Sequence, residues 1–233
     1  MRIMSGIIQI AGIMNQKEAE MLMERGVDWL GFPLRLTVHK EDLPEAEAAR
    51  IIRKIRLPHE AVLITYLNRA DEIVGLSRRL GVRRVQLHGP VLLAELKRTK
   101  AIAPNLFLIK SLIVKKNNRH DLEEELIDIS PCVDAFITDT FDPESNASGA
   151  TGKTHDWKAS RRLVEISERP VILAGGLNPE NVASAIEQVQ PAGVDAHTGV
   201  ENSDGRKDLE LVQRFVSEAR KGFNRVSSAR GFA

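Results

Sequence analysis

Three observations on the sequence predict an α/β fold, a single (β/α)8 TIM barrel. Short apolar segments alternate eight times with longer amphipathic segments along the 233 residues. The apolar segments are nearly continuous, as in Val171–Ala174, which is typical of parallel strands buried on both faces. Glycines follow the last two of them, where an eight-stranded barrel commonly holds a phosphate group. The length and the number of alternations favour a closed barrel over an open, doubly wound sheet.

Each strand is predicted where apolar and β-branched residues run together between turn-forming residues. The first of these segments, Ile7–Ala11, ends at Gly12. The predicted strands are Ile7–Ala11, Asp28–Phe32, Ala61–Tyr66, Arg83–His88, Leu106–Val114, Asp134–Asp139, Val171–Ala174 and Val194–His197.

Capping residues mark several of the helices between these strands. Asn15 is a good N-cap with Gly26 as the stop, and Asn178 is a good N-cap with Pro179 as the first helical residue. The predicted helices are Gln16–Arg25, Pro44–Lys54, Ala70–Leu80, Val91–Thr99, Leu122–Ile129, Trp157–Ser167, Pro179–Gln188 and Leu209–Lys221. No linker divides residues 1–223, which we expect to form the barrel. The segment 224–233 lacks an amphipathic period and is expected to be a frayed C-terminal tail.

Composition excludes several classes of partner. The chain has 33 basic and 32 acidic residues, and 4% of its residues are aromatic, so the composition predicts no surface that binds nucleic acid. No apolar run approaches the ~18 residues of a membrane span, and the N-terminus lacks a signal-peptide pattern. Cys132 is the single cysteine, so no disulfide forms within the chain, and we expect a cytoplasmic protein. The sequence leaves open whether it is a monomer or a homodimer.

The ends of the last two strands predict a phosphate site. Gly175 and Gly176 follow one strand, and Thr198 and Gly199 follow the other. Glycines let a phosphate approach the backbone closely, and free N–H groups at a helix start favour an anion. The competing interpretation is that these residues only form tight turns.

Four segments resemble phosphoribosylanthranilate isomerase of tryptophan biosynthesis. They are Gln86–Gly89, Gly149–Trp157, Leu173–Val182 and Gly199–Glu201 with the following Gly205–Asp208, and the resemblance extends from Ile8 to about Ala219. It implies a (β/α)8 barrel, a phosphoribosyl substrate, and neither a metal nor an organic cofactor. The family reaction is an Amadori rearrangement, in which an aminoaldose becomes an aminoketose.

The resemblance implies one acid and one base. The family acid is an aspartate that ends strand six, which is Asp139 here; a capping or salt-bridged aspartate is the alternative. The family base is a cysteine within a Lys-x-Cys-Gly segment at the end of strand one. Here Gln9 replaces the lysine and Ala11 replaces the cysteine. A methyl group accepts no proton, and a general base contributes about 10²–10⁴-fold to rate.

The loop after the second strand also departs from the family, which holds the anthranilate carboxylate with a Ser-Pro-Arg arginine. Here Arg35, His39 and Lys40 are the candidates, and lysine lacks the two-pronged contact of arginine. Gln9 is a further candidate contact to substrate. His88, at the end of strand four, is either a structural histidine or part of the site wall.

His197 ends the last strand, which lies beside the first in a closed barrel. We therefore consider the hypothesis that its neutral imidazole replaces the missing base. The alternative is a histidine that contacts phosphate or packs at the rim. Lys153 and His155 are expected to be solvated.

Three functions are compatible with these residues. The first is a phosphoribosylanthranilate-type isomerase, or a relative that acts on another phosphoribosylated amine. The second is another reaction of a sugar phosphate, such as epimerisation, or an aldolase reaction if Lys110 faces the site. The third is a barrel that only binds a sugar phosphate, because Ala11 stands in place of the base.

Overall fold

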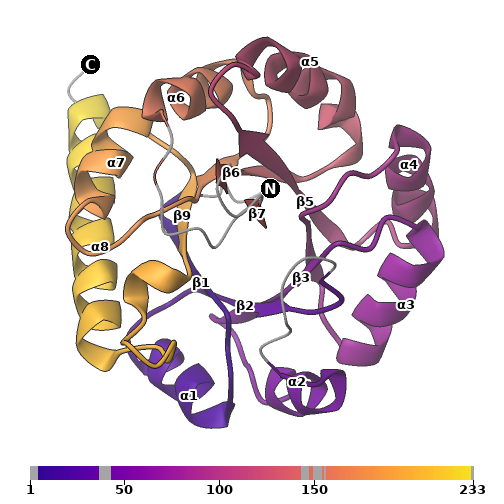
Figure 1. The fold of residues 1–233 in the computed structure, drawn as a ribbon, viewed down its shortest axis with the longest axis horizontal. Coiled ribbons are helices and arrows are strands. Elements are labelled where there is room, and N and C mark those ends of the chain that lie inside the picture. The colour runs from indigo at the N-terminus through magenta and orange to yellow at the C-terminus, as the bar shows by residue number, and fades with distance from the viewer. Residues whose placement is uncertain (1–4, 37–42, 143–146, 149–153, 155, 232–233) are drawn as a thin grey trace.

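A computed structural model describes residues 5–36, 43–142, 147–148, 154 and 156–231. In Figure 1 a ring of strands surrounds the centre of the molecule and helices cover its outside. This arrangement confirms the predicted (β/α)8 barrel. Among the described residues, no helix has both the length and the apolar character needed to cross a bilayer.

The barrel strands pair in parallel and close into a ring. Their order is β5-β4-β3-β2-β1-β9-β8-β6, and β5 also pairs with β6, which closes the ring. Each predicted strand is present within one or two residues of its expected bounds. The strands are β1 Ile7–Ala11, β2 Trp29–Pro33, β3 Glu60–Thr65, β4 Arg84–Leu87, β5 Phe107–Val114, β6 Ala135–Asp142, β8 Val171–Leu173 and β9 Gly193–Ala196, with only β6 extending further.

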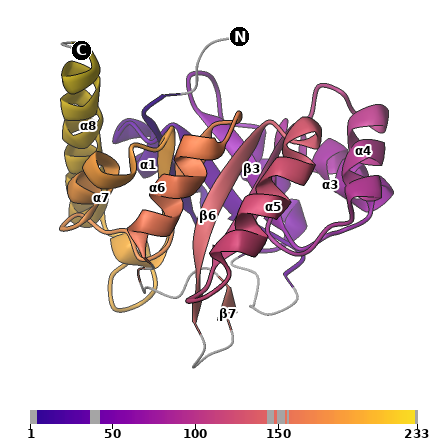
Figure 2. The same ribbon diagram turned by 90° about the horizontal axis from the view of Figure 1, so that it is seen from above.

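The extension of β6 was not predicted from the sequence. The predicted strand ends at Asp139, but β6 continues to Asp142 and pairs antiparallel with β7, Ala147–Ser148. Figure 2 shows this hairpin projecting from one end of the barrel. Because the C-terminal ends of all barrel strands point the same way, this end is the mouth of the barrel.

The helices alternate with the strands as predicted. Asn15 caps the first helix as expected, since its side-chain oxygen accepts a hydrogen bond from the Glu18 N–H at 3.0 Å. The helices are α1 Gln16–Glu24, α2 Glu45–Ile52, α3 Ala70–Leu80, α4 Leu93–Ile102, α5 Arg119–Ile129, α6 Trp157–Ile166, α7 Val182–Val189 and α8 Leu209–Gly231.

Four helix boundaries differ from expectation by three residues or more. Helix α4 ends at Ile102 instead of Thr99, and helix α5 begins at Arg119 instead of Leu122. Helix α7 begins at Val182, not at Pro179, because the Asn178 side chain accepts hydrogen bonds from the N–H groups of Glu180 and Asn181 and holds a turn there. Helix α8 continues to Gly231 through the segment expected to be a frayed tail. An ion pair of 2.7 Å between Arg225 and Glu187 ties that extension to α7.

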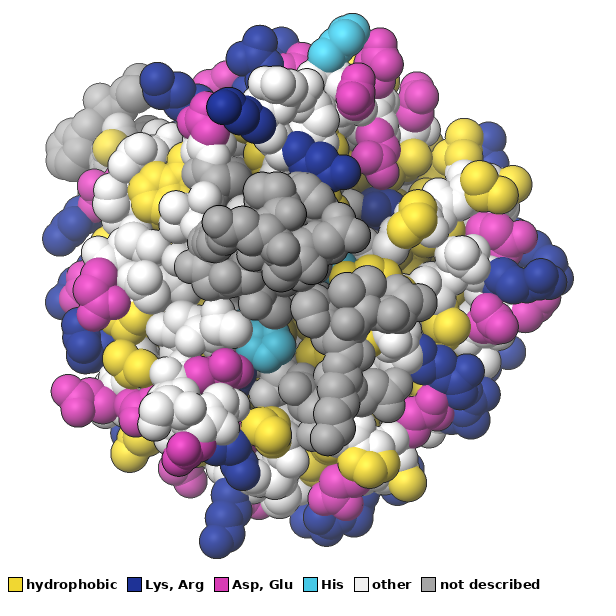
Figure 3. Space-filling view, in the orientation of Figure 1, with side chains coloured by type: hydrophobic (Ala, Val, Ile, Leu, Met, Phe, Trp, Pro, Cys, Tyr) yellow, Lys and Arg dark blue, Asp and Glu magenta, His cyan; other side chains and the backbone are white. Residues whose placement is uncertain are grey.

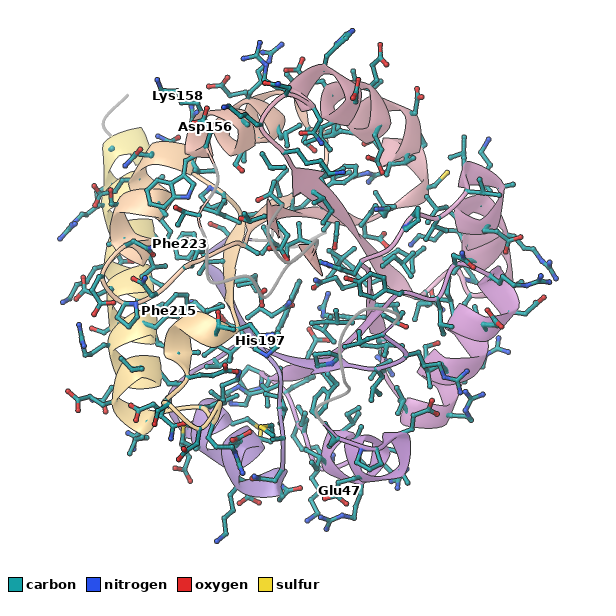
Figure 4. The ribbon with its side chains drawn as sticks, viewed as in Figure 1. Glu47, Asp156, Lys158, His197, Phe215 and Phe223 are labelled. Carbon is teal, nitrogen blue, oxygen red and sulfur yellow. The ribbon has the colours of Figure 1, made fainter. Side chains whose placement is uncertain are left out.

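Apolar side chains fill two separate regions. One lies between the strands and the helices, where Phe215 and Phe223 point from α8 toward the barrel (Figure 4). The other fills the barrel interior and includes Ala11, Val62, Ile109, Ile137, Ile172 and Ala174. Since residues alternate between the two faces of a strand, this set identifies which positions point inward.

Arg84 closes the end of the interior opposite the mouth. Its guanidinium lies 4.4 Å from the ring centroid of Trp29 and 4.6 Å from that of Phe107. It also forms an ion pair with Glu60. The first residues of four adjacent strands thus form a cation–π and ionic cluster at this end.

We expect Arg84→Met to lower the free energy of unfolding by about 1–2 kcal/mol, because it keeps most of the side-chain volume but loses the cation over both rings. Urea unfolding of the variant measures this change. Arg50→Met, which removes an exposed ion pair with Glu47 on α2, is the control and is expected to leave the midpoint unchanged. Equal effects of the two variants would contradict a role for the ring contacts.

Candidate active site

A row of inward-pointing residues crosses four adjacent strands near the mouth. Thr138 pairs with Leu173 and Leu173 pairs with Val194, so the next residues on these strands, Asp139, Ala174 and Asp195, are also in register. Gln9 pairs directly with Asp195. Asp139 shares the face of Ile137, and Gln9 reaches across the barrel to Gln86, with 2.9 Å between the amide nitrogen and oxygen. The row therefore presents two carboxyl groups to the barrel interior.

Asp139 is buried at the C-terminal end of the barrel interior, with 7% of its surface exposed. The Thr140 N–H donates a hydrogen bond of 2.7 Å to its carboxyl group. Burial outweighs this bond and raises the pKa of Asp139 to about 7. A carboxyl group with this pKa is protonated in a large fraction of molecules near neutral pH, so it can donate a proton.

Asp195 lies on the other side of Ala174 from Asp139. It is also buried, with 8% of its surface exposed. Burial and the charge of Asp139 raise its pKa to about 7, while a hydrogen bond from Gln9 and the charge of Lys207 oppose the increase. Among the described residues, none donates a hydrogen bond to its Oδ1 atom.

The raised pKa of Asp195 makes the stability of the protein depend on pH. In the unfolded chain the carboxyl group has its usual pKa of 3.8, so between about pH 4 and pH 7 the folded state binds more protons. Stability conferred by the protonated carboxyl is therefore lost as pH rises through this window. We expect Asp195→Asn to raise the melting temperature relative to the parent chain more at pH 8 than at pH 4.5. A pH-independent difference would contradict the raised pKa.

Tyr66 and Ser111 also line the mouth, although neither was a candidate from the sequence. His88 has its Nδ1 3.0 Å from the Ser111 hydroxyl, and its ring packs edge-on against Tyr66 with centroids 5.1 Å apart. Burial and the charge of Asp139 raise the pKa of Tyr66 to about 12. His88 is thus bonded to Ser111 and packed against Tyr66, which itself lies within the influence of the Asp139 charge. The position of Tyr66 directly after an apolar strand was the available signal for this second wall.

His197 lies at the inner edge of the ring, beside the end of β1 (Figure 4). Gly12 follows Ala11 with a φ of 80°, and a Cβ atom there would overlap the His197 imidazole. The imidazole Nε2 is 3.4 Å from a carboxylate oxygen of Glu201. The buried Lys207 ammonium holds the same carboxylate and donates to the His197 carbonyl oxygen at 3.3 Å. The structure thus places the His197 imidazole against Gly12, the residue that follows Ala11.

The two glycine-containing loops contact each other. Gly175 and Gly176 both have positive φ values, of 94° and 63°. Gly199 lies in a short 3-10 helix, Thr198–Val200, and a Cβ atom on it would overlap the Leu177 carbonyl oxygen. The glycine therefore allows the loop after β9 to pack directly on the loop after β8. The candidate phosphate residues accordingly lie together at one side of the mouth.

Other candidates are less central. Arg35 has a φ of 55°. Its side chain is half-exposed, and its Nε lies 2.6 Å from the carboxylate of Glu45 on α2. Lys110 lies on the outer face of β5, since its ammonium is 3.6 Å from Glu125 of α5, so it does not serve the aldolase interpretation. His39, Lys40, Lys153 and His155 lie outside the described residues.

The surface around the mouth carries basic and acidic side chains interspersed around the rim (Figure 3). This distribution agrees with the formal net charge of +1. Among the described residues, no three His, Cys, Asp or Glu side chains are grouped so as to hold a metal ion.

Comparison with known proteins identifies the same family across nearly the whole chain. The family model described as N-(5'-phosphoribosyl)anthranilate isomerase matches residues 8–218. N-(5'-phosphoribosyl)anthranilate isomerase 2 of Methanosarcina mazei is 37% identical over 221 residues, which cover 94% of this chain and 96% of that protein. The Haloferax volcanii isomerase is 33% identical, with 91% and 92% covered.

Solved structures agree with this match. The phosphoribosylanthranilate isomerase of Thermotoga maritima has a TM-score of 0.78 at 29% identity, covering 92% of this chain and 98% of that one. A second isomerase structure, in complex with reduced 1-(o-carboxyphenylamino)-1-deoxyribulose 5-phosphate, has a TM-score of 0.76 at 26% identity, with the same coverage. Because the family model covers most of the chain and the barrel agrees with solved structures of the same family, the chain belongs to the N-(5'-phosphoribosyl)anthranilate isomerase family.

Proposed function

We propose that this chain catalyses the isomerisation of N-(5'-phosphoribosyl)anthranilate in tryptophan biosynthesis, as a cytoplasmic enzyme. The observation that carries the proposal is Asp139, a buried carboxyl group with a pKa of about 7 at the mouth of a barrel of this family. The reaction opens a ribose ring, which requires a proton donor at the ring oxygen. Asp139 has both the burial and the protonation state for this step.

The phosphate of the substrate would be bound by the two glycine loops. The N–H groups at the start of a short helix have no acceptor within it, and Thr198 and Gly199 open such a helix beside Gly176. A phosphate at this side of the mouth would place the ribose over the centre of the barrel. Gln9 and His88 would then contact the ribose.

The anthranilate group would extend toward the loop after β2, where Arg35, His39 and Lys40 are the candidates for its carboxylate. Arg35 would have to leave Glu45, its present ion-pair partner, or bind the substrate beside it. Every group in this proposal comes from one chain, so the site needs no second copy to be complete. Neither a metal nor an organic cofactor takes part in the steps proposed.

Loss of anthranilate fluorescence during turnover of phosphoribosylanthranilate tests the proposal. We expect enzyme-dependent turnover that saturates with substrate and is inhibited by a ribose phosphate analogue. A chain that binds the analogue but leaves the fluorescence at its uncatalysed rate would overturn the isomerase function. That outcome would favour the barrel that only binds a sugar phosphate.

A further inference from the structure

Two buried aspartates lie on either side of one small residue in the barrel interior. Asp139 on β6 and Asp195 on β9 are separated by β8 alone, and the residue in register between them is Ala174. Neighbouring strands are about 4.8 Å apart, so second neighbours in a curved barrel lie within roughly 10 Å. Both positions point into the barrel interior, on either side of the alanine, so the two side chains share the same part of it.

Among the residues that the structure describes, none neutralises this pair by direct contact. Gln9, the partner of Asp195 on β1, is a neutral amide. The ammonium of Lys207 acts on Asp195 from a distance, because it is held by Glu201 and the His197 carbonyl. Two buried carboxyl groups that repel each other do not both ionise readily, so near neutral pH the pair holds one proton.

The isomerisation needs one protonated and one ionised group in the same site. One group must be protonated to open the ring and another ionised to accept the proton from C2 of the ribose. A pair that holds a single proton supplies an acid and a base at the same pH. Ala11 cannot act as the base, and one oxygen of Asp195 accepts no hydrogen bond from the described residues.

We propose that Asp195 accepts the C2 proton in this chain and works as a pair with Asp139, in place of the base missing at Ala11. Asp139 gives its proton to the ring oxygen as the bond from that oxygen to C1 breaks, which leaves an iminium ion. The Asp195 carboxylate then takes the C2 proton, and the electrons of the C–H bond form the enolamine. The pair holds one proton before and after, and the enolamine tautomerises to the aminoketose.

His197 is the competing base. Its imidazole is held against Gly12 and beside the Glu201 carboxylate, at the side of the mouth where the glycine loops lie. This position suits a contact near the phosphate. Asp195 lies in the same register row as the acid, which suits a proton transfer on the ring that the acid opens.

The proposal rests on the isomerase function and is tested with Asp195→Asn and Ala11→Cys, alone and combined. Asp195→Asn should lower kcat by about 10²-fold or more and change KM little, because it removes a proton acceptor and keeps the side-chain shape. Adding Ala11→Cys to the Asp195→Asn variant should raise kcat again by about tenfold or more, since a thiolate can accept the same proton. Asp204→Asn, at an exposed aspartate, is the matched control.

Two results would overturn the role of Asp195. One is a fall in activity that Ala11→Cys does not rescue, with KM rising alongside, because that result describes a structural carboxylate. The other is near-parental turnover of Asp195→Asn together with a large loss in His197→Ala, which would assign the base to His197.

A measurement without substrate separates this proposal from the isomerase function. Titration of ¹³C-labelled aspartate carboxyl groups by NMR should show the Asp139 carboxyl ionising at lower pH in Asp195→Asn, since the like charge is gone. An unchanged titration would disprove the pair whether or not the protein is active. If the titrations are coupled but the protein does not turn over phosphoribosylanthranilate, the carboxyl pair exists. The isomerase function and the proposed proton transfer are then both rejected.

Discussion

Asp139→Asn is expected to lower turnover of phosphoribosylanthranilate by about 10²–10⁴-fold, the usual contribution of a general acid. An asparagine keeps the shape of the side chain and can still accept the Thr140 N–H, but its amide is too weak an acid to protonate the ring oxygen. Because burial raises the pKa of Asp139 to about 7, the activity of the parent chain should also fall as pH rises above 7. Initial rates of fluorescence loss across pH 5–9 measure both effects.

Asp128→Asn, at an exposed position of α5, is the control and should keep the parental rate. The Asp139→Asn variant should bind a ribose phosphate analogue as the parent chain does, which shows that its site is intact. A rate within threefold of the parent, or an unchanged decline above pH 7 in the residual activity, would mean that the acid is another residue.

Gly199→Ala is expected to raise KM by tenfold or more, with a smaller effect on kcat. The added methyl group would overlap the Leu177 carbonyl oxygen, which is backbone and cannot rotate away. The loops after β8 and β9 would have to separate, so the proposed phosphate site would lose its geometry. Steady-state kinetics measure KM, and protection against thermal unfolding by inorganic phosphate measures the site without catalysis.

Gly75→Ala is the matched control because it adds the same methyl group in helix α3, where the nearest atom is the flexible end of Arg79 at 3.6 Å. It should leave KM unchanged. If Gly199→Ala keeps the KM of the parent chain and is protected by phosphate to the same extent, the phosphate binds elsewhere or the loops tolerate the added methyl group.

Local sequence predicted the elements of this fold well, for reasons that are themselves local. Runs such as Val171–Leu173 are apolar at every position, which is typical of a strand buried on both faces. Helix α3 begins and ends at the predicted residues, since the Gly81 that follows it adopts the left-handed conformation that ends a helix. Helix α7 begins later than predicted because the Asn178 side chain accepts hydrogen bonds from the N–H groups of Glu180 and Asn181 and holds a turn before the helix.

The sequence by itself thus determined the barrel, the order of its elements and the positions of the glycine loops. It placed Asp139 at the end of a strand, but that strand continues to Asp142. Only the tertiary structure decided which side chains meet. Strand register sets Asp139 and Asp195 on either side of Ala174, and the phase of β5 turns Lys110 toward α5. Register and phase depend on pairing between segments far apart in the chain, so no local pattern contains them.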